Sequence, residues 1–153
     1  LAWFHNALRC FDKALEINPD LDVVYESKSL TLSRMGKKKE AIECGLRGIE
    51  INPNNFVVLG NLVEWYNYLQ DFDNGLKYAN KILSQKSLIS KILSKDHLAG
   101  VYFNKANSQF YLNDPDFKNS MTLAIQTTTS YYEKQRFKEH MKKMASFFQN
   151  PYE

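Results

Sequence analysis

Two segments of the chain end in Glu-Ile-Asn-Pro, and they repeat one another at a spacing of 34 residues, with Pro19 in the first and Pro53 in the second. At this offset six of the thirteen positions from residue 7 to residue 19 are identical, and two leucines are matched by isoleucine; most of these positions are apolar or lie in the turn. The frame continues more weakly through residues 75–83, where no proline closes the unit. A period of this length is the signature of an array of small stacked units.

The unit at residues 22–55 has the pattern of two helices joined by a turn. Asp22 precedes a run of helically spaced apolar residues, and we expect it to cap the first helix. Gly36 fits the C-terminus of that helix, because glycine adopts a left-handed conformation at little cost. The second helix must end before Pro53. A pair of helices this short cannot bury its apolar faces alone, so neighbouring pairs are expected to stack into a solenoid.

These residues resemble the tetratricopeptide repeat (TPR), a unit of 34 residues with a large residue early in its first helix, small residues where its helices cross and a proline at its end. Tyr25, Ser29, Ala41 and Pro53 stand at those characteristic positions of the second copy. In the third copy Ile82 is a large residue in a position that is small in the family. The resemblance implies an all-α fold, a right-handed α-solenoid of stacked antiparallel helix pairs, to which we add a C-terminal capping helix.

The whole chain, residues 1–153, is therefore expected to form a single TPR-like domain. The predicted divisions are the second half of a repeat at 1–21, repeats at 22–55 and 56–86, an irregular insert at 87–96, a degenerate repeat at 97–129 and a capping helix at 130–150. Since residue 1 falls in the turn of the first repeat, the pattern predicts that the chain is a fragment of a longer protein.

The insert has two readings. Residues 81–95 contain two similar five-residue strings, KILSQ and KILSK, and carry several lysines with no acidic neighbour before Asp96. They fit either a lengthened basic helix or a loop followed by a short helix. In both cases we expect Asp96 to cap the helix that opens the degenerate repeat.

The C-terminal segment, residues 133–148, is strongly amphipathic. Four of its apolar residues share one helical stripe: Phe137, Met141, Met144 and Phe148. Because the last repeat of a solenoid leaves an apolar face open, we expect this stripe to cover it. A basic helix that binds a membrane surface or another protein is the alternative.

The residues for catalysis are sparse, and we predict no enzyme, no cofactor and no metal. The three histidines lie far apart in sequence, and no phosphate-binding loop, serine elbow or Cys-x-x-Cys motif occurs. Cys10 and Cys44 stand at equivalent points of the repeat and are interpreted as small apolar residues of helices rather than a disulfide. No apolar run approaches the roughly 20 residues of a membrane span. The expected location is cytoplasmic, with the nucleus as the alternative.

We therefore predict a non-enzymatic interaction scaffold that binds a peptide or protein segment, of unknown identity, in the concave groove of the solenoid. First helices of the repeats line such a groove. The candidate contacts are Val23, Glu26, Leu30, Arg34, Val57, Asn61, Glu64, Asn67, Tyr68, Tyr102, Lys105 and Gln109.

One subclass of the resembled family binds the C-terminal carboxylates of heat-shock chaperones through a basic, asparagine-lined clamp. Asn61 matches one clamp position, but Glu26 and Leu30 stand where the clamp needs lysine and asparagine. A carboxylate beside Glu26 would be repelled, so we do not expect chaperone tails to bind.

Charge asymmetry raises another class of partner. Residues 1–73 carry a net charge of −3 and residues 74–153 a net charge of +6. A nucleic-acid binder using the basic half with Tyr131, Tyr132 and Arg136 is one alternative, although the charge is modest for that role and nucleic acid is not the expected partner. A module that targets an upstream enzyme is another.

Overall fold

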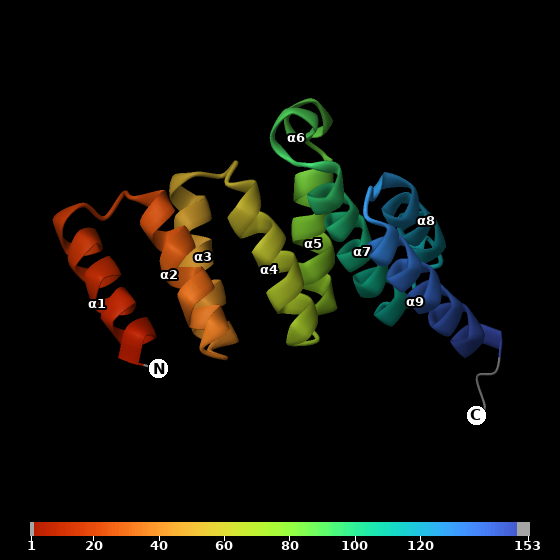
Figure 1. The fold of residues 1–153 in the computed structure, drawn as a ribbon, viewed down its shortest axis with the longest axis horizontal. Helices are drawn as coiled ribbons and strands as arrows, with labels where there is room; N and C mark the ends of the chain where they lie inside the picture. Colours follow the sequence, from red (N-terminus) through yellow and green to blue (C-terminus); the bar gives the residue numbers. More distant parts are fainter. Residues whose placement is uncertain (1, 150–153) are drawn as a thin grey trace.

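The computed structural model describes residues 2–149, and within them every regular element is a helix. The helices are α1 (Ala2–Ile17), α2 (Asp22–Arg34), α3 (Lys38–Ile51), α4 (Phe56–Tyr68), α5 (Phe72–Leu83), α6 (Lys86–Ile92), α7 (Lys95–Tyr111), α8 (Phe117–Thr127) and α9 (Tyr131–Gln149). They follow one another along the long axis of the molecule from α1 to α9, and α6 projects at one end of α5 and α7 (Figure 1).

Adjacent helices form the tight pairs α2–α3, α4–α5 and α7–α8, and each pair packs against the next. The predicted all-α solenoid of stacked helix pairs is confirmed. Ala41 is fully buried where α2 and α3 meet, as expected for a small residue at a helix crossing. The large Ile82 is also fully buried, so the neighbouring helices accommodate its volume.

The structure has some of the helix ends that the sequence predicts and differs from it at others. Gly36 has φ +81° directly after α2, as its position predicts, and the Asn55 side chain accepts a hydrogen bond from the Val58 backbone N–H at the start of α4. Asp22 does not cap α2, because the N-cap position falls on Leu21. Asp96 does not cap α7 either, since the Ser94 hydroxyl accepts the bond from the His97 N–H instead.

The insert contains a helix. Residues 81–95 are neither one lengthened helix nor wholly irregular, because α5 ends at Leu83 and α6 runs from Lys86 to Ile92 before α7 begins. The buried side chain of Ile89 attaches α6 to the main core. The half-buried Leu88 packs against the same core, so the short helix has an apolar face to bury.

The core is divided into two clusters that meet at α7. The larger lies among α2 to α7 and contains the fully buried Leu59 and Leu62. The smaller lies among α7, α8 and α9, around Phe117 and Phe137. Val101 of α7 belongs to the first and Ala99 to the second, so α7 joins the two halves of the core.

The C-terminal helix covers the end of the solenoid as predicted. Phe137 and Met144 of α9 are buried, and the half-buried Met141 packs against the same cluster. The side chain of Phe148 lies outside the described residues. The Phe137 ring stacks on Phe103 with 4.5 Å between ring centroids, which joins α9 to α7.

Candidate functional site

A groove of about 600 Å³ runs between α2, α4 and α7, which are the first helices of successive pairs. The turn before α4 and the end of α6 complete its walls. The lining residues are Asp22, Val23, Asn52, Asn54, Asn55, Phe56, Val57, Gly60, Asn61, Glu64, Ile92, Leu93, Asp96, His97, Gly100, Val101 and Asn104.

Apolar side chains line this groove from three elements. Val23 of α2, Val57 of α4 and Ile92 of α6 are 60%, 53% and 56% exposed, respectively. Below them Phe56 and Val101 are buried in the core. Three exposed aliphatic side chains facing one hollow leave apolar area in water that a ligand would cover.

Two glycines leave room on opposite walls. Gly60 lies within α4 and Gly100 within α7, and a Cβ atom built at either position would meet nothing within 4 Å. Glycine within a helix costs about 1 kcal/mol relative to alanine. Neither internal packing nor a positive φ requires glycine at these positions, and their effect is to widen the groove.

Carboxylates provide most of the charge along the groove. Asp22, Glu64 and Asp96 line it, and His97 is the remaining titratable lining residue. The Asp22 carboxylate accepts a bond from the Asn52 side chain at 2.7 Å. No lysine or arginine lines the groove among the residues that the structure describes.

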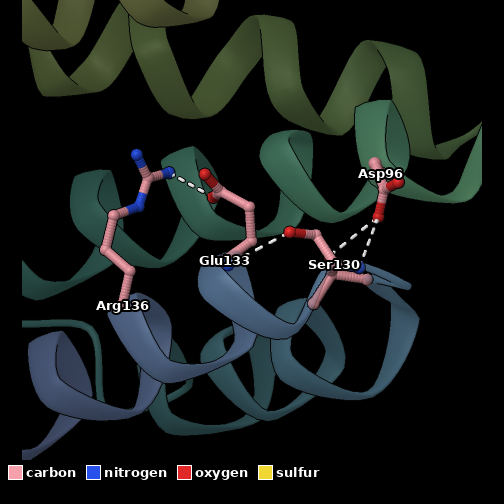
Figure 2. A network of polar contacts seen from close by, with 5 residues as sticks. Asp96, Ser130, Glu133 and Arg136 are labelled. Atoms are coloured by element: carbon pink, nitrogen blue, oxygen red, sulfur yellow. Dashed lines mark hydrogen bonds and ion pairs between the residues drawn. The ribbon is translucent and has the colours of Figure 1, made fainter.

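Asp96 joins the start of α7 to the turn that precedes α9 (Figure 2). Its carboxylate accepts bonds from the Thr128 hydroxyl at 2.8 Å, from the Thr129 hydroxyl at 2.8 Å and backbone N–H at 2.7 Å, and from the Ser130 N–H at 3.4 Å. The bonds from Thr128 and Thr129, followed by that from Ser130, lower the pKa of Asp96 from 3.8 to about 2. Asp96 is therefore ionised throughout the physiological range.

We expect Asp96→Asn to lower the melting temperature at neutral pH, because an amide cannot accept all of these bonds. The bonds hold the folded pKa below the unfolded one, so their contribution is present above pH 3.8 and is lost as pH falls toward about 2. The melting temperatures of the two proteins should therefore converge over that interval when followed by circular dichroism. Asp73→Asn, at an exposed position in the first turn of α5, is the control. A difference that stays constant down to pH 2 would contradict this role.

Four of the twelve candidate contacts line the groove: Val23, Val57, Asn61 and Glu64. Glu26 lies just behind them, and its carboxylate accepts a bond from the Asn55 side chain at 2.8 Å. Leu30 and Arg34 lie further along α2, outside the lining. Contact between these residues and a partner stays a prediction.

Two further candidates form hydrogen bonds within the fold. Gln109 is only 3% exposed, accepts from the Ser120 hydroxyl and donates to Asp114, so it is a buried structural group rather than a surface contact. Asn67 donates to the Asn104 carbonyl at 2.8 Å and accepts from the Ser108 hydroxyl, which ties α4 to α7.

The last three candidates lie away from the groove. Tyr68 is exposed at the end of α4, with the Lys38 ammonium 5.5 Å from its ring centroid. Tyr102 packs against the smaller core cluster, and Lys105 is half-buried on α7 without lining the groove.

Sequence reasoning placed the helix that is now α7 on the groove, but it missed the residues of α6 and α7 that line the groove. Ile92, Leu93, His97 and Asn104 all line the groove. The apolar residues of the string KILSK were the available signal, because Ile92 and Leu93 stand where a short helix ends.

A second hollow of about 720 Å³ lies between α1, α2 and α3. Several of its charged side chains pair with one another: Lys28 with Asp12 at 2.6 Å, Lys37 with Glu40 at 3.2 Å and Arg47 with Glu50 at 2.8 Å. Because these charged groups already pair with one another, this hollow is a weaker candidate for a binding site than the groove is.

The cysteines lie apart and both are free thiols. Cys44 lines the second hollow, and burial raises the pKa of its thiol to about 11. The thiol is therefore protonated and a poor nucleophile at neutral pH. Cys10 is exposed, contrary to the expected apolar contact.

Other kinds of site find little support in the described part of the chain. No three His, Cys, Asp or Glu side chains of residues 2–149 gather as a metal site would require. None of the helices in that range has the length and apolarity needed to cross a bilayer. In the basic half, Arg136 pairs with Glu133 at 2.6 Å (Figure 2), and its guanidinium lies 5.2 Å from the Phe137 ring centroid.

The stacked helix pairs and the groove along their first helices define an α-helical repeat protein of the solenoid class. Residues 23–55 match the model of the tetratricopeptide repeat family. These residues, one unit of the array, are therefore a tetratricopeptide repeat.

Two relatives match parts of the chain. The TPR repeat-containing protein MJ0940 of Methanocaldococcus jannaschii is 38% identical over 77 residues, which are 50% of this chain and 24% of that protein. The protein STIP1 homolog of Dictyostelium discoideum is 29% identical over 51 residues, which are 33% of this chain and 9% of that protein. The matched stretches thus span a quarter or less of these relatives.

Proposed function

We propose that this chain is a non-enzymatic interaction module that binds a peptide or protein segment in the groove between α2, α4 and α7. The observation that carries the proposal is the groove itself, a hollow of about 600 Å³ whose walls combine exposed aliphatic side chains with asparagines and carboxylates. The match of residues 23–55 to a repeat family supports the same role.

Binding in this groove requires little rearrangement of the chain. Phe56 and Val101 beneath the groove belong to the larger core cluster, so its floor is held by packing. Asn61 and Asn104 place amide groups on facing walls, where they can bond the backbone of an extended segment. A preformed site of this kind loses little conformational entropy on binding.

Selection from a displayed random-peptide library, followed by a groove-blocking variant, tests the proposal. Because Gly60 faces open space, Gly60→Trp should fill the groove while leaving the fold intact, and peptides selected on the wild type should lose at least tenfold in affinity. Asn119→Trp, at an exposed position of α8, is the control and should bind normally. Peptides that bind both variants equally would place the binding surface elsewhere and overturn the proposal.

Nucleic acid is not the partner we propose, because Arg136 of the basic half is engaged by Glu133 and by aromatic rings.

A cytoplasmic location, with the nucleus as the alternative, stays a prediction. The role as a targeting module of an enzyme also stays a prediction.

A further inference from the structure

The unbalanced charge of the groove points to the chemistry of its occupant. Asp22, Glu64 and Asp96 come from three different helices and lie on different walls, so they follow the groove rather than forming one cluster. The ion pairs formed within residues 2–149 involve none of these three carboxylates. Glu26 adds a further carboxylate directly behind the wall of the groove, where it accepts a hydrogen bond from the Asn55 side chain.

The helix termini reduce this charge but do not cancel it. The N-termini of α2, α4 and α7 all lie at one end of the groove, and each contributes about half a positive charge. Three such termini offset about 1.5 of the three formal negative charges of the lining. The effect falls off within the first turn, and Glu64 lies in the third turn of α4. The negative potential is therefore strongest around Glu64.

Space for a ligand side chain lies next to Glu64. Gly60 precedes Glu64 by four residues on α4, so the two positions share one face of the helix. Glu64 is exposed, and a Cβ atom at Gly60 would meet nothing within 4 Å. A long cationic side chain can therefore lie over Gly60 with its charged end at the Glu64 carboxylate.

We propose that the groove selects a peptide segment that carries lysine or arginine, and this inference rests on the proposed function of the groove. The cationic side chain binds at Glu64, while apolar side chains of the same segment cover Val57 and Ile92. The methylene stem of lysine or arginine suits this arrangement, because it packs on apolar surface while its charge meets a carboxylate. Acidic segments are excluded by repulsion.

Three synthetic pools of twelve-residue peptides test the selectivity. The pools share the same apolar positions and carry only lysine, only glutamine or only glutamate at the polar ones. Fluorescence anisotropy with the full 153-residue chain at 0.15 M salt should rank them lysine, glutamine, glutamate. Glu64→Lys should weaken binding of the lysine pool about five- to tenfold, since it replaces one attraction by a repulsion.

Two controls separate this inference from the proposed function. Glu43→Lys makes the same change in charge at an exposed position of α3 outside the groove, and should change affinity less than twofold. If it weakens the lysine pool as much as Glu64→Lys does, the attraction is non-specific and the inference fails. If the glutamine or glutamate pool binds equally well and Gly60→Trp abolishes that binding, the inference fails and the proposed function stands. If no pool shows binding that Gly60→Trp removes, the proposed function itself fails.

Discussion

Replacing Phe137 with alanine is expected to lower the free energy of unfolding by about 3–5 kcal/mol. The Phe137 ring is only 1% exposed and lies at the centre of the smaller core cluster, stacked on Phe103 of α7. Alanine would remove the buried area of the ring and leave a cavity between α7, α8 and α9. This cost is a large share of the 5–15 kcal/mol that stabilises an ordinary domain.

Urea denaturation followed by circular dichroism measures this effect. Tyr132→Ala removes an aromatic ring from the same helix at a position that is 84% exposed, and should change stability by less than about 0.5 kcal/mol. A loss confined to Phe137→Ala would show that α9 is part of the folded core. Equal, small effects of the two substitutions would mean that α9 is attached loosely and that its apolar stripe is available to a partner.

The solenoid could be predicted because its signals are local. The spacing of the repeat and the turn at Gly36 each depend on a few neighbouring residues, and the structure has both. The caps assigned to Asp22 and Asp96 were wrong for a non-local reason. Their carboxylates bond to Asn52 and to Thr128 and Thr129, which lie about 30 residues away in sequence.

The candidate site was harder to predict, because the spacing of a polar residue on a helix does not show whether a neighbouring helix of the same chain buries it. Gln109 and Asn67 have the same spacing as surface residues, yet each bonds to a neighbouring helix. The groove-lining residues of α6 and α7 were missed for a different reason. The insert interrupts the period, so the repeat frame gave no groove-facing position to Ile92 and Leu93.

Gly75→Ala is expected to destabilise the fold by about 2–3 kcal/mol, although alanine is the better helix former. Gly75 is buried within α5, and a Cβ atom there would overlap the amide oxygen of Asn67 and lie 2.9 Å from the Ser108 hydroxyl. Asn67 cannot move away without losing its bonds to Asn104 and Ser108. The close approach of α4, α5 and α7 at this point therefore requires glycine.

A double-mutant cycle with Asn67→Ala tests this explanation. Asn67→Ala alone should cost about 1–2 kcal/mol through the lost bonds, but it also removes the amide that a Cβ atom at residue 75 would meet. The double variant should then be less destabilised than the sum of the two by about 1 kcal/mol or more. Gly60→Ala, the same change in a helix with open space around it, should instead stabilise by about 0.5–1 kcal/mol. Strict additivity of the cycle would show that Gly75 and Asn67 are not coupled. A Gly75→Ala variant as stable as the wild type would show that the α4–α5–α7 junction tolerates a side chain at residue 75.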